Sequence, residues 1–186
     1  SSDVCSSDLI STENTWARSY PAGVFGPTAV ELACLDYGVT NTGSAFPLAV
    51  SVYRDTDGGS PVSPGADLEL IGEVEAIAVA GLVSGVQSVS FDPPICISPE
   101  DTIVVTMGIG SGSDGFLGFA GNSLPDAGAT YILSESCGVA GFTNLADIGF
   151  ADYHWVQRLT LNELCSSDNC PADLNGDGVV NDGEIG

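Results

Sequence analysis

The chain has 186 residues, which predicts one domain or one domain with a small appendage. Its 25 acidic residues stand against three basic ones, all arginines, giving a formal net charge of −22. Because so acidic a protein repels phosphate backbones and anionic lipid, we expect no nucleic-acid binding and no peripheral membrane role. We also expect no membrane insertion, since the longest apolar runs, Ala76–Val83 and Ile103–Met107, are far shorter than the roughly 20 residues that a membrane helix needs. The absence of lysine also excludes Schiff-base chemistry and a P-loop lysine.

Residues 1–10 are treated separately as an N-terminal arm. Residues 1–9 read Ser-Ser-Asp-Val-Cys-Ser-Ser-Asp-Leu, which is what a common sequencing-library adaptor encodes in one frame. Two interpretations stay open: an adaptor artefact or a genuine polar arm. The fold prediction therefore does not depend on this segment or on Cys5.

Short β-rich runs separated by turn clusters follow, and we expect about nine strands. Such spacing predicts an all-β fold, an antiparallel β-sandwich or jelly roll over residues 11–164. No long window has a helical period. The expected strands are Thr15–Tyr20, Ala29–Val39, Leu48–Asp55, Leu68–Ala78, Val86–Phe91, Thr102–Gly108, Gly115–Gly121, Ala129–Ser134 and Tyr153–Asn162.

Alternation of apolar and polar residues shows which side chains face the core. Turns are expected at glycine and proline clusters such as Pro93-Pro94, and one helical turn is expected over residues 143–148 with Thr143 as its cap. The residues expected to share a buried face are Val30, Leu32 and Cys34 in one strand, and Leu48, Val50 and Val52 in the next.

Four stretches resemble a secreted bacterial β-sandwich module found in extracellular proteins of aquatic bacteria. The resemblance covers residues 11–163 and implies a fold and an extracellular location, but no catalytic residues. The stretches are Asn14-Thr15-Trp16-Ala17-Arg18-Ser19-Tyr20, Gly118-Phe119-Ala120-Gly121-Asn122, Tyr131 to Gly138, and Leu145-Ala146-Asp147-Ile148-Gly149-Phe150 with Tyr153-His154.

Residues 173–184 fit the calcium-loop pattern D-x-[DN]-x-[DN]-G-x₅-E at every defining position. Calcium takes six to eight oxygen ligands, and the pattern supplies them from alternate positions, with a closing glutamate that binds through both oxygens. Gly178 permits the sharp turn. The expected Ca²⁺ ligands are Asp173, Asn175, Asp177, Val179 (through its carbonyl), Asn181 and Glu184.

This C-terminal segment, residues 165–186, resembles half of a dockerin-type, EF-hand-like calcium repeat. Such loops pair through the apolar eighth position, here Val180, and a dockerin has two of them. Cys165 and Cys170 bracket the entry to the loop and could close a small disulfide ring, or each could pair elsewhere.

Six cysteines without the spacing of a zinc ribbon favour disulfides and an oxidising compartment, so we expect a secreted, extracellular or cell-surface protein. If Cys5 is an artefact and Cys165 pairs with Cys170, one bridge and one thiol remain among Cys34, Cys96 and Cys137.

Other candidate sites are weaker. Asp55-Thr56-Asp57-Gly58-Gly59 begins like a calcium loop but has no glutamate at the closing spacing, so we interpret it as a hairpin turn. The single histidine, His154, favours a structural role over a zinc site or a triad. No sequence feature selects a carboxylate pair, and we expect no enzyme. The aromatic residues that could stack on sugars, or lie in the core, are Trp16, Trp155, Tyr20, Tyr53 and Tyr153.

Two functions remain. The first is a structural subunit of an extracellular filament, matrix or surface layer, with a calcium-stabilised C-terminal junction and with other copies of itself as partners, through strand exchange by a terminal arm. The alternative is a carbohydrate-binding or adhesion module tethered by its calcium repeat. An exposed row of aromatic side chains would favour the second function.

Overall fold

The chain forms an all-β fold in a computed structural model, which describes residues 14–42, 45–78, 85–109, 117–123, 128–135 and 138–163. Every pairing between its named strands is antiparallel. The all-β, antiparallel class predicted from the sequence is therefore confirmed. No helix within these residues is long and apolar enough to cross a membrane.

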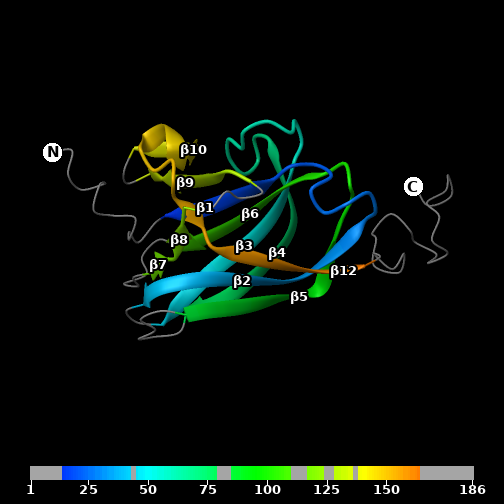
Figure 1. Cartoon of the computed structure of the whole chain (residues 1–186), viewed down its shortest axis with the longest axis horizontal. Helices are drawn as coiled ribbons and strands as arrows, with labels where there is room; N and C mark the ends of the chain where they lie inside the picture. The colour runs from blue at the N-terminus through cyan, green and yellow to red at the C-terminus, as the bar shows by residue number, and fades with distance from the viewer. Residues whose placement is uncertain are drawn as a thin grey trace.

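The described residues contain twelve strands and one short 3₁₀ helix, where the sequence predicted about nine strands (Figure 1). In chain order they are β1 (Thr15–Tyr20), β2 (Val30–Thr42), β3 (Phe46–Asp55), β4 (Leu68–Ala78), β5 (Gly85–Ile97), β6 (Thr102–Ile109), β7 (Leu117–Phe119), β8 (Gly121–Asn122), β9 (Thr130–Ser134), β10 (Val139–Asn144), η2 (Leu145–Ile148), β11 (His154–Trp155) and β12 (Gln157–Glu163).

Two sheets face each other and enclose the main core (Figure 1). One has six strands in the order β10-β9-β1-β6-β3-β4; the other has the order β12-β2-β5, with β7 also paired to β2. A short β8–β11 pair stands apart. The core joins side chains of the first sheet (Trp16, Leu48, Val50, Val52 and Met107) to side chains of the second (Leu32, Leu35, Val89 and Phe91). This arrangement is a β-sandwich, whereas jelly-roll connectivity stays a prediction.

A second, smaller core covers the outer face of the six-stranded sheet. Neighbouring residues of a strand point to opposite faces, so Ala17 and Val104 project away from the main core. They pack with Leu68, Tyr131 and Phe142. The connection between β3 and β4 lies over this face, because the Phe142 N–H donates to the Val62 carbonyl at 2.8 Å.

The predicted buried face of β2 is correct at its start and wrong at Cys34. Leu32 pairs with Ile95 and Cys34 pairs with Ser90, so the register shifts between them. A bulge of this kind turns the strand and moves later side chains to the other face. Cys34 is half-buried, whereas Leu35 is fully buried. Alternation in β3 is confirmed, because Leu48, Val50 and Val52 are all fully buried.

Three other local predictions need correction. Pro93-Pro94 does not end a strand: β5 continues through it, and the prolines, which lack an N–H, occupy the irregular stretch opposite the β2 bulge. The sequence did not predict β10. The single strand predicted over Gly115–Gly121 is replaced by two short strands, β7 and the start of β8. The predicted helical turn is the 3₁₀ helix η2, and its cap is Asn144, whose side chain accepts from the Ala146 N–H, rather than Thr143.

Candidate functional site

The β3–β4 connection begins with two nested turns made by aspartate side chains. Asp55 Oδ1 accepts from the N–H groups of Asp57 (3.2 Å) and Gly58 (2.9 Å), and Asp57 Oδ1 accepts from the Gly59 N–H (2.8 Å). Gly58 has a φ of +69°, which glycine adopts without strain. These bonds give the chain a tight bend directly after β3.

The same connection is closed at its far end by Asp67. Asp67 Oδ2 accepts from the Val62 N–H at 2.7 Å, and Oδ1 accepts from the Ser63 N–H at 3.0 Å. Its carbonyl accepts from both the N–H and the hydroxyl of Thr56, each at 2.9 Å. The end of the connection is thereby held against its beginning.

β3 and β4 do form a hairpin, as predicted, because Asp55 pairs with Leu68. However, the connection spans residues 56–67 and is not a tight turn at residues 55–59. Its length lets an aspartate from the far end approach the first two.

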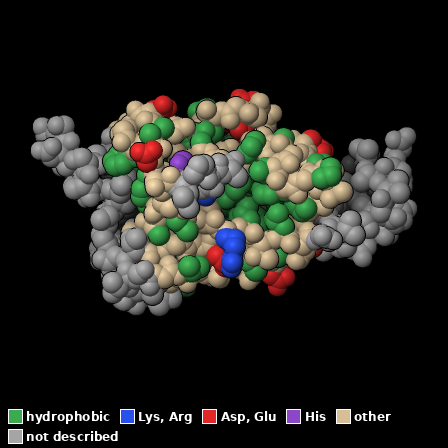
Figure 2. Space-filling view, viewed as in Figure 1, with side chains coloured by type: hydrophobic (Ala, Val, Ile, Leu, Met, Phe, Trp, Pro, Cys, Tyr) green, Lys and Arg blue, Asp and Glu red, His purple; other side chains and the backbone are tan. Residues whose placement is uncertain are grey.

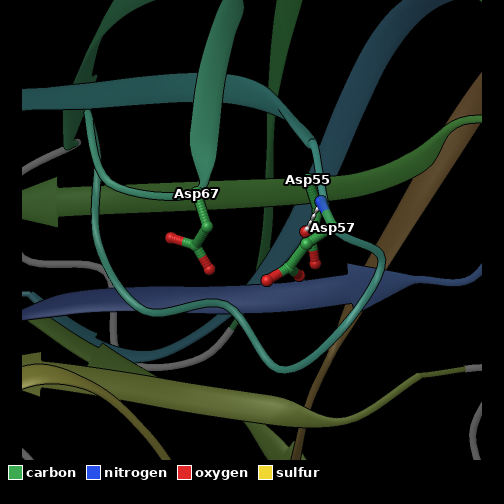
Figure 3. Close-up of side chains that lie close together, drawn as sticks. All are labelled: Asp55, Asp57 and Asp67. Carbon is green, nitrogen blue, oxygen red and sulfur yellow. Dashed lines mark hydrogen bonds between the residues drawn. The ribbon is translucent and has the colours of Figure 1, made fainter.

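Three carboxylates converge in this connection (Figure 3). One oxygen from each of Asp55, Asp57 and Asp67 lies within 4.8 Å of the others. Asp55 is 5 % exposed and Asp67 is 9 % exposed, whereas Asp57 is open to solvent. Asp55 Oδ2 is buried and has no hydrogen-bond partner. Two of the three acids are therefore removed from water next to like charges.

Burial raises the pKa of Asp55 above its ordinary value. The N–H groups of Gly58 and Asp57 stabilise the ionised form and lower this pKa, while the neighbouring Asp57 carboxyl raises it; the net shift is upward. The nearest arginine in sequence acts elsewhere, because Arg54 pairs with Asp101 and Glu69, each at 2.9 Å.

A second feature is the side of the sandwich where both sheets end. Within the described residues β4 pairs only with β3, and β5 only with β2. A groove of about 510 Å³ lies between them. Ile77 of β4 is 58 % exposed and Val86 of β5 is 68 % exposed. The groove is lined by both apolar and polar residues, namely Tyr37, Val74, Glu75, Ala76 and Ile77, and Val86, Gln87, Ser88, Val89 and Ser90 of β5.

The surface is acidic without one dominant acidic patch on the face in view. Figure 2 shows Asp and Glu side chains at separate points of that face, between apolar side chains. Arg158 donates to Asp36 through Nε at 2.8 Å. Bonds from the Ser88 hydroxyl and from Arg158 lower the pKa of Asp36.

The calcium ligands predicted from the C-terminal motif lie outside the described residues. These are Asp173, Asn175, Asp177, Val179, Asn181 and Glu184, together with the Cys165–Cys170 pair that precedes them. Within the described residues, the one group of three potential metal ligands is Asp55, Asp57 and Asp67, and it does not include His154.

The aromatic residues considered for sugar stacking lie in the interior. Trp16 and Trp155 are 1 % and 0 % exposed, and both rings contact Phe119. Tyr20 is buried, Tyr53 and Tyr153 are half-buried, and the Tyr153 hydroxyl donates to the Phe119 carbonyl at 2.8 Å. No aromatic side chain that the structure describes is in the exposed class.

Cys34 is a free thiol whose Sγ lies 3.5 Å from Ser90 Oγ. Cys96 lies opposite Glu31 in the same sheet, so the register does not bring Cys34 and Cys96 face to face. Cys5, Cys137, Cys165 and Cys170 lie outside the described residues.

No protein-family model, curated protein or solved structure matches this chain. The resemblances to a secreted β-sandwich module and to a dockerin-type repeat stay predictions.

Proposed function

We propose that this chain is a secreted structural subunit of an extracellular filament, matrix or surface layer, in which copies associate through the sandwich side formed by β4 and β5. The observation that supports this proposal is the pair of long edge strands with exposed Ile77 and Val86 on either side of a groove. An unpaired strand edge is a template for another strand, and natural proteins usually protect such edges with lysine, proline or a cover.

Protection of this edge is incomplete, since the prolines of β5, Pro93 and Pro94, lie in the irregular stretch opposite the β2 bulge and not beside Val86. The chain has no lysine, and β4 has Glu73 and Glu75 as its only exposed charges near Ile77. Each copy has a net charge of −22, so copies repel one another in the absence of cations. Association therefore needs a cation that screens or bridges the carboxylates, and calcium, for which the sequence contains a loop at residues 173–184, suits this role.

Strand exchange by residues 1–10 belongs to the same proposal as a means of filling a neighbour's sheet edge. The alternative function, carbohydrate binding, has less support, since the described aromatic side chains are buried or half-buried.

The test is electron microscopy and light scattering of the full chain in calcium and after chelation. We expect ordered assemblies in calcium that dissociate on chelation. The paired substitutions Ile77→Gln and Val86→Gln should abolish assembly, because they remove the apolar side chains of the association edge without changing the net charge. The matched control is Ile148→Gln on η2, where the isoleucine is also exposed (42 %) but lies away from this edge.

Monomers in both conditions would contradict the assembly proposal and direct attention to glycan-binding assays. If the variant with Ile77→Gln and Val86→Gln still forms assemblies, the contact does not involve β4 and β5.

A further inference from the structure

The carboxylate of Asp55 is the least satisfied acidic group that the structure describes. The side chain is 95 % removed from solvent, since only 5 % of its surface is exposed. Oδ1 accepts two backbone N–H groups, but Oδ2 is buried and accepts none. Because a buried carboxylate oxygen without a donor is strongly unfavourable, it calls for either a proton or a cation.

The groups beside the Asp55 carboxylate make the need for positive charge greater. Figure 3 shows the carboxylates of Asp57 and Asp67 directed into the same space as that of Asp55. Each supplies a further oxygen within 4.8 Å. Arg54, the neighbouring cation, has its Nε on Asp101 and its Nη1 on Glu69.

We propose that Asp55, Asp57 and Asp67 bind one calcium ion at the β3–β4 connection. This site is distinct from the loop at residues 173–184, and it does not depend on the assembly function. Oxygens bound to one calcium at 2.3–2.6 Å can lie up to about 5 Å apart, so the observed spacing allows a shared ion without refolding of the connection.

The hydrogen bonds leave enough lone pairs for this ligand set. An ionised carboxylate has about four acceptor positions. Asp67 uses one on each oxygen for the Val62 and Ser63 N–H groups, and Asp57 uses one on Oδ1 for Gly59. Asp55 Oδ2 has both of its positions available. The solvent-exposed side at Asp57 admits the ion and the waters that complete its coordination.

Calcium suits the site better than magnesium. Magnesium demands near-octahedral geometry and is usually held by one or two carboxylates, whereas calcium accepts irregular sets of oxygen ligands. Bound there, the ion joins the first and last residues of the connection. Because Val62 in this connection accepts from Phe142 of β10, the ion also secures the cover over the outer core.

The test is a calcium titration of the full chain at neutral pH, after removal of metal, followed by amide nuclear magnetic resonance. The probes are the N–H groups that donate to the three carboxylates, namely those of Gly58, Gly59, Val62 and Ser63. We expect these signals to shift and saturate together.

Asp57→Asn is the informative variant, since Asp57 is exposed and asparagine keeps an oxygen for the Gly59 N–H. We expect it to weaken calcium binding at these probes by about tenfold or more, because calcium affinity depends on the number of charged ligands. Asp152→Asn, which removes an exposed charge elsewhere, should leave the binding unchanged.

Glu184→Gln separates the two calcium sites, since it removes the closing ligand of the C-terminal loop and should not affect the Gly58 signal. Three results would overturn the proposal. In the first, the probe signals do not saturate with calcium. In the second, Asp57→Asn binds as tightly as Asp152→Asn. In the third, the probes respond to pH but not to calcium, which would mean that Asp55 holds a proton in place of an ion.

Discussion

The substitution Asp57→Asn should raise the stability of the fold without calcium and reduce the stabilisation that calcium adds. In a chelator the three carboxylates only repel one another. Two unit charges 4.8 Å apart repel by about 1 kcal/mol at the dielectric constant of water and by about 3.5 kcal/mol at an effective value of 20. Because Asp57 is exposed, the lower figure applies to each of its two pairs, with Asp55 and with Asp67, and its neutralisation should stabilise the fold by about 1–2 kcal/mol.

In calcium the same substitution removes a ligand. A ligand at 100 times its dissociation constant adds about 2.7 kcal/mol of stability, and a tenfold weaker site adds about 1.3 kcal/mol less. The calcium-dependent gain in the free energy of unfolding should therefore fall by at least that amount in the variant. Calcium binding by the loop predicted at residues 173–184 would contribute equally to both proteins, so its effect cancels in the comparison.

Urea unfolding followed by tryptophan fluorescence measures this quantity, since Trp16 and Trp155 are buried in the main core. Asp152→Asn is the control for loss of one exposed negative charge. The reasoning is refuted if Asp57→Asn destabilises the protein in chelator, or if calcium stabilises the variant and the control equally.

Two further predictions concern the sandwich itself. Gly72→Ala should destabilise the fold by about 1–3 kcal/mol through overpacking, because a Cβ there would lie 2.2 Å from Ile95 Cδ1. Urea unfolding measures this loss of stability. The loss caused by Gly72→Ala should be smaller in a protein that already contains Ile95→Ala. Burial raises the pKa of three tyrosines from 10.0 to about 12. Because these phenols ionise at a lower pH in the unfolded chain than in the folded one, their contribution to stability is fully present below about pH 10 and is lost as the pH rises through about 12. Ultraviolet absorbance should show these phenols ionising at a higher pH than tyrosine in the urea-unfolded chain, and a transition near pH 10 for all tyrosines would contradict their burial. The three are Tyr20, Tyr37 and Tyr153.

The sequence predicted strands best where one face of a strand must be buried and the register is regular. β1 and β4 have the predicted bounds, and the alternation of Leu48, Val50 and Val52 is confirmed. A period-2 pattern carries enough information for such strands. The sequence failed where the register shifts, because a bulge changes which residues face the core without changing the composition of the strand. Cys34 and Leu35 exchanged roles for this reason.

The aspartate cluster could be predicted only in part. Asp55 and Asp57 carry a local signal, since an aspartate two residues before another and followed by glycine predicts a turn with carboxylates on one side. Asp67 carries no such local signal, because its approach to Asp55 and Asp57 depends on the path of residues 56–67. That path is fixed by tertiary contacts, including the bond between Phe142 and Val62 over the outer core. A sequence motif with constant spacing therefore does not predict a ligand that comes from the far end of such a connection.

The three arginines leave most of the negative charge of this chain without a basic partner. Arg18 lies in the interior and donates to the Trp155 carbonyl, Arg54 pairs with Asp101 and Glu69, and Arg158 pairs with Asp36. Because 25 acidic residues stand against three arginines in the sequence, most carboxylates have no arginine available to them, and cations from solution can reduce their mutual repulsion. Both proposals therefore share a requirement for cations, and a monovalent salt separates screening from binding. Screening acts on all exposed charges and follows ionic strength, whereas the Asp55 site needs an ion that accepts several oxygens at once. If sodium chloride at the ionic strength of the calcium buffer produces the same assembly and the same stabilisation, then screening alone is sufficient and a specific calcium requirement is refuted.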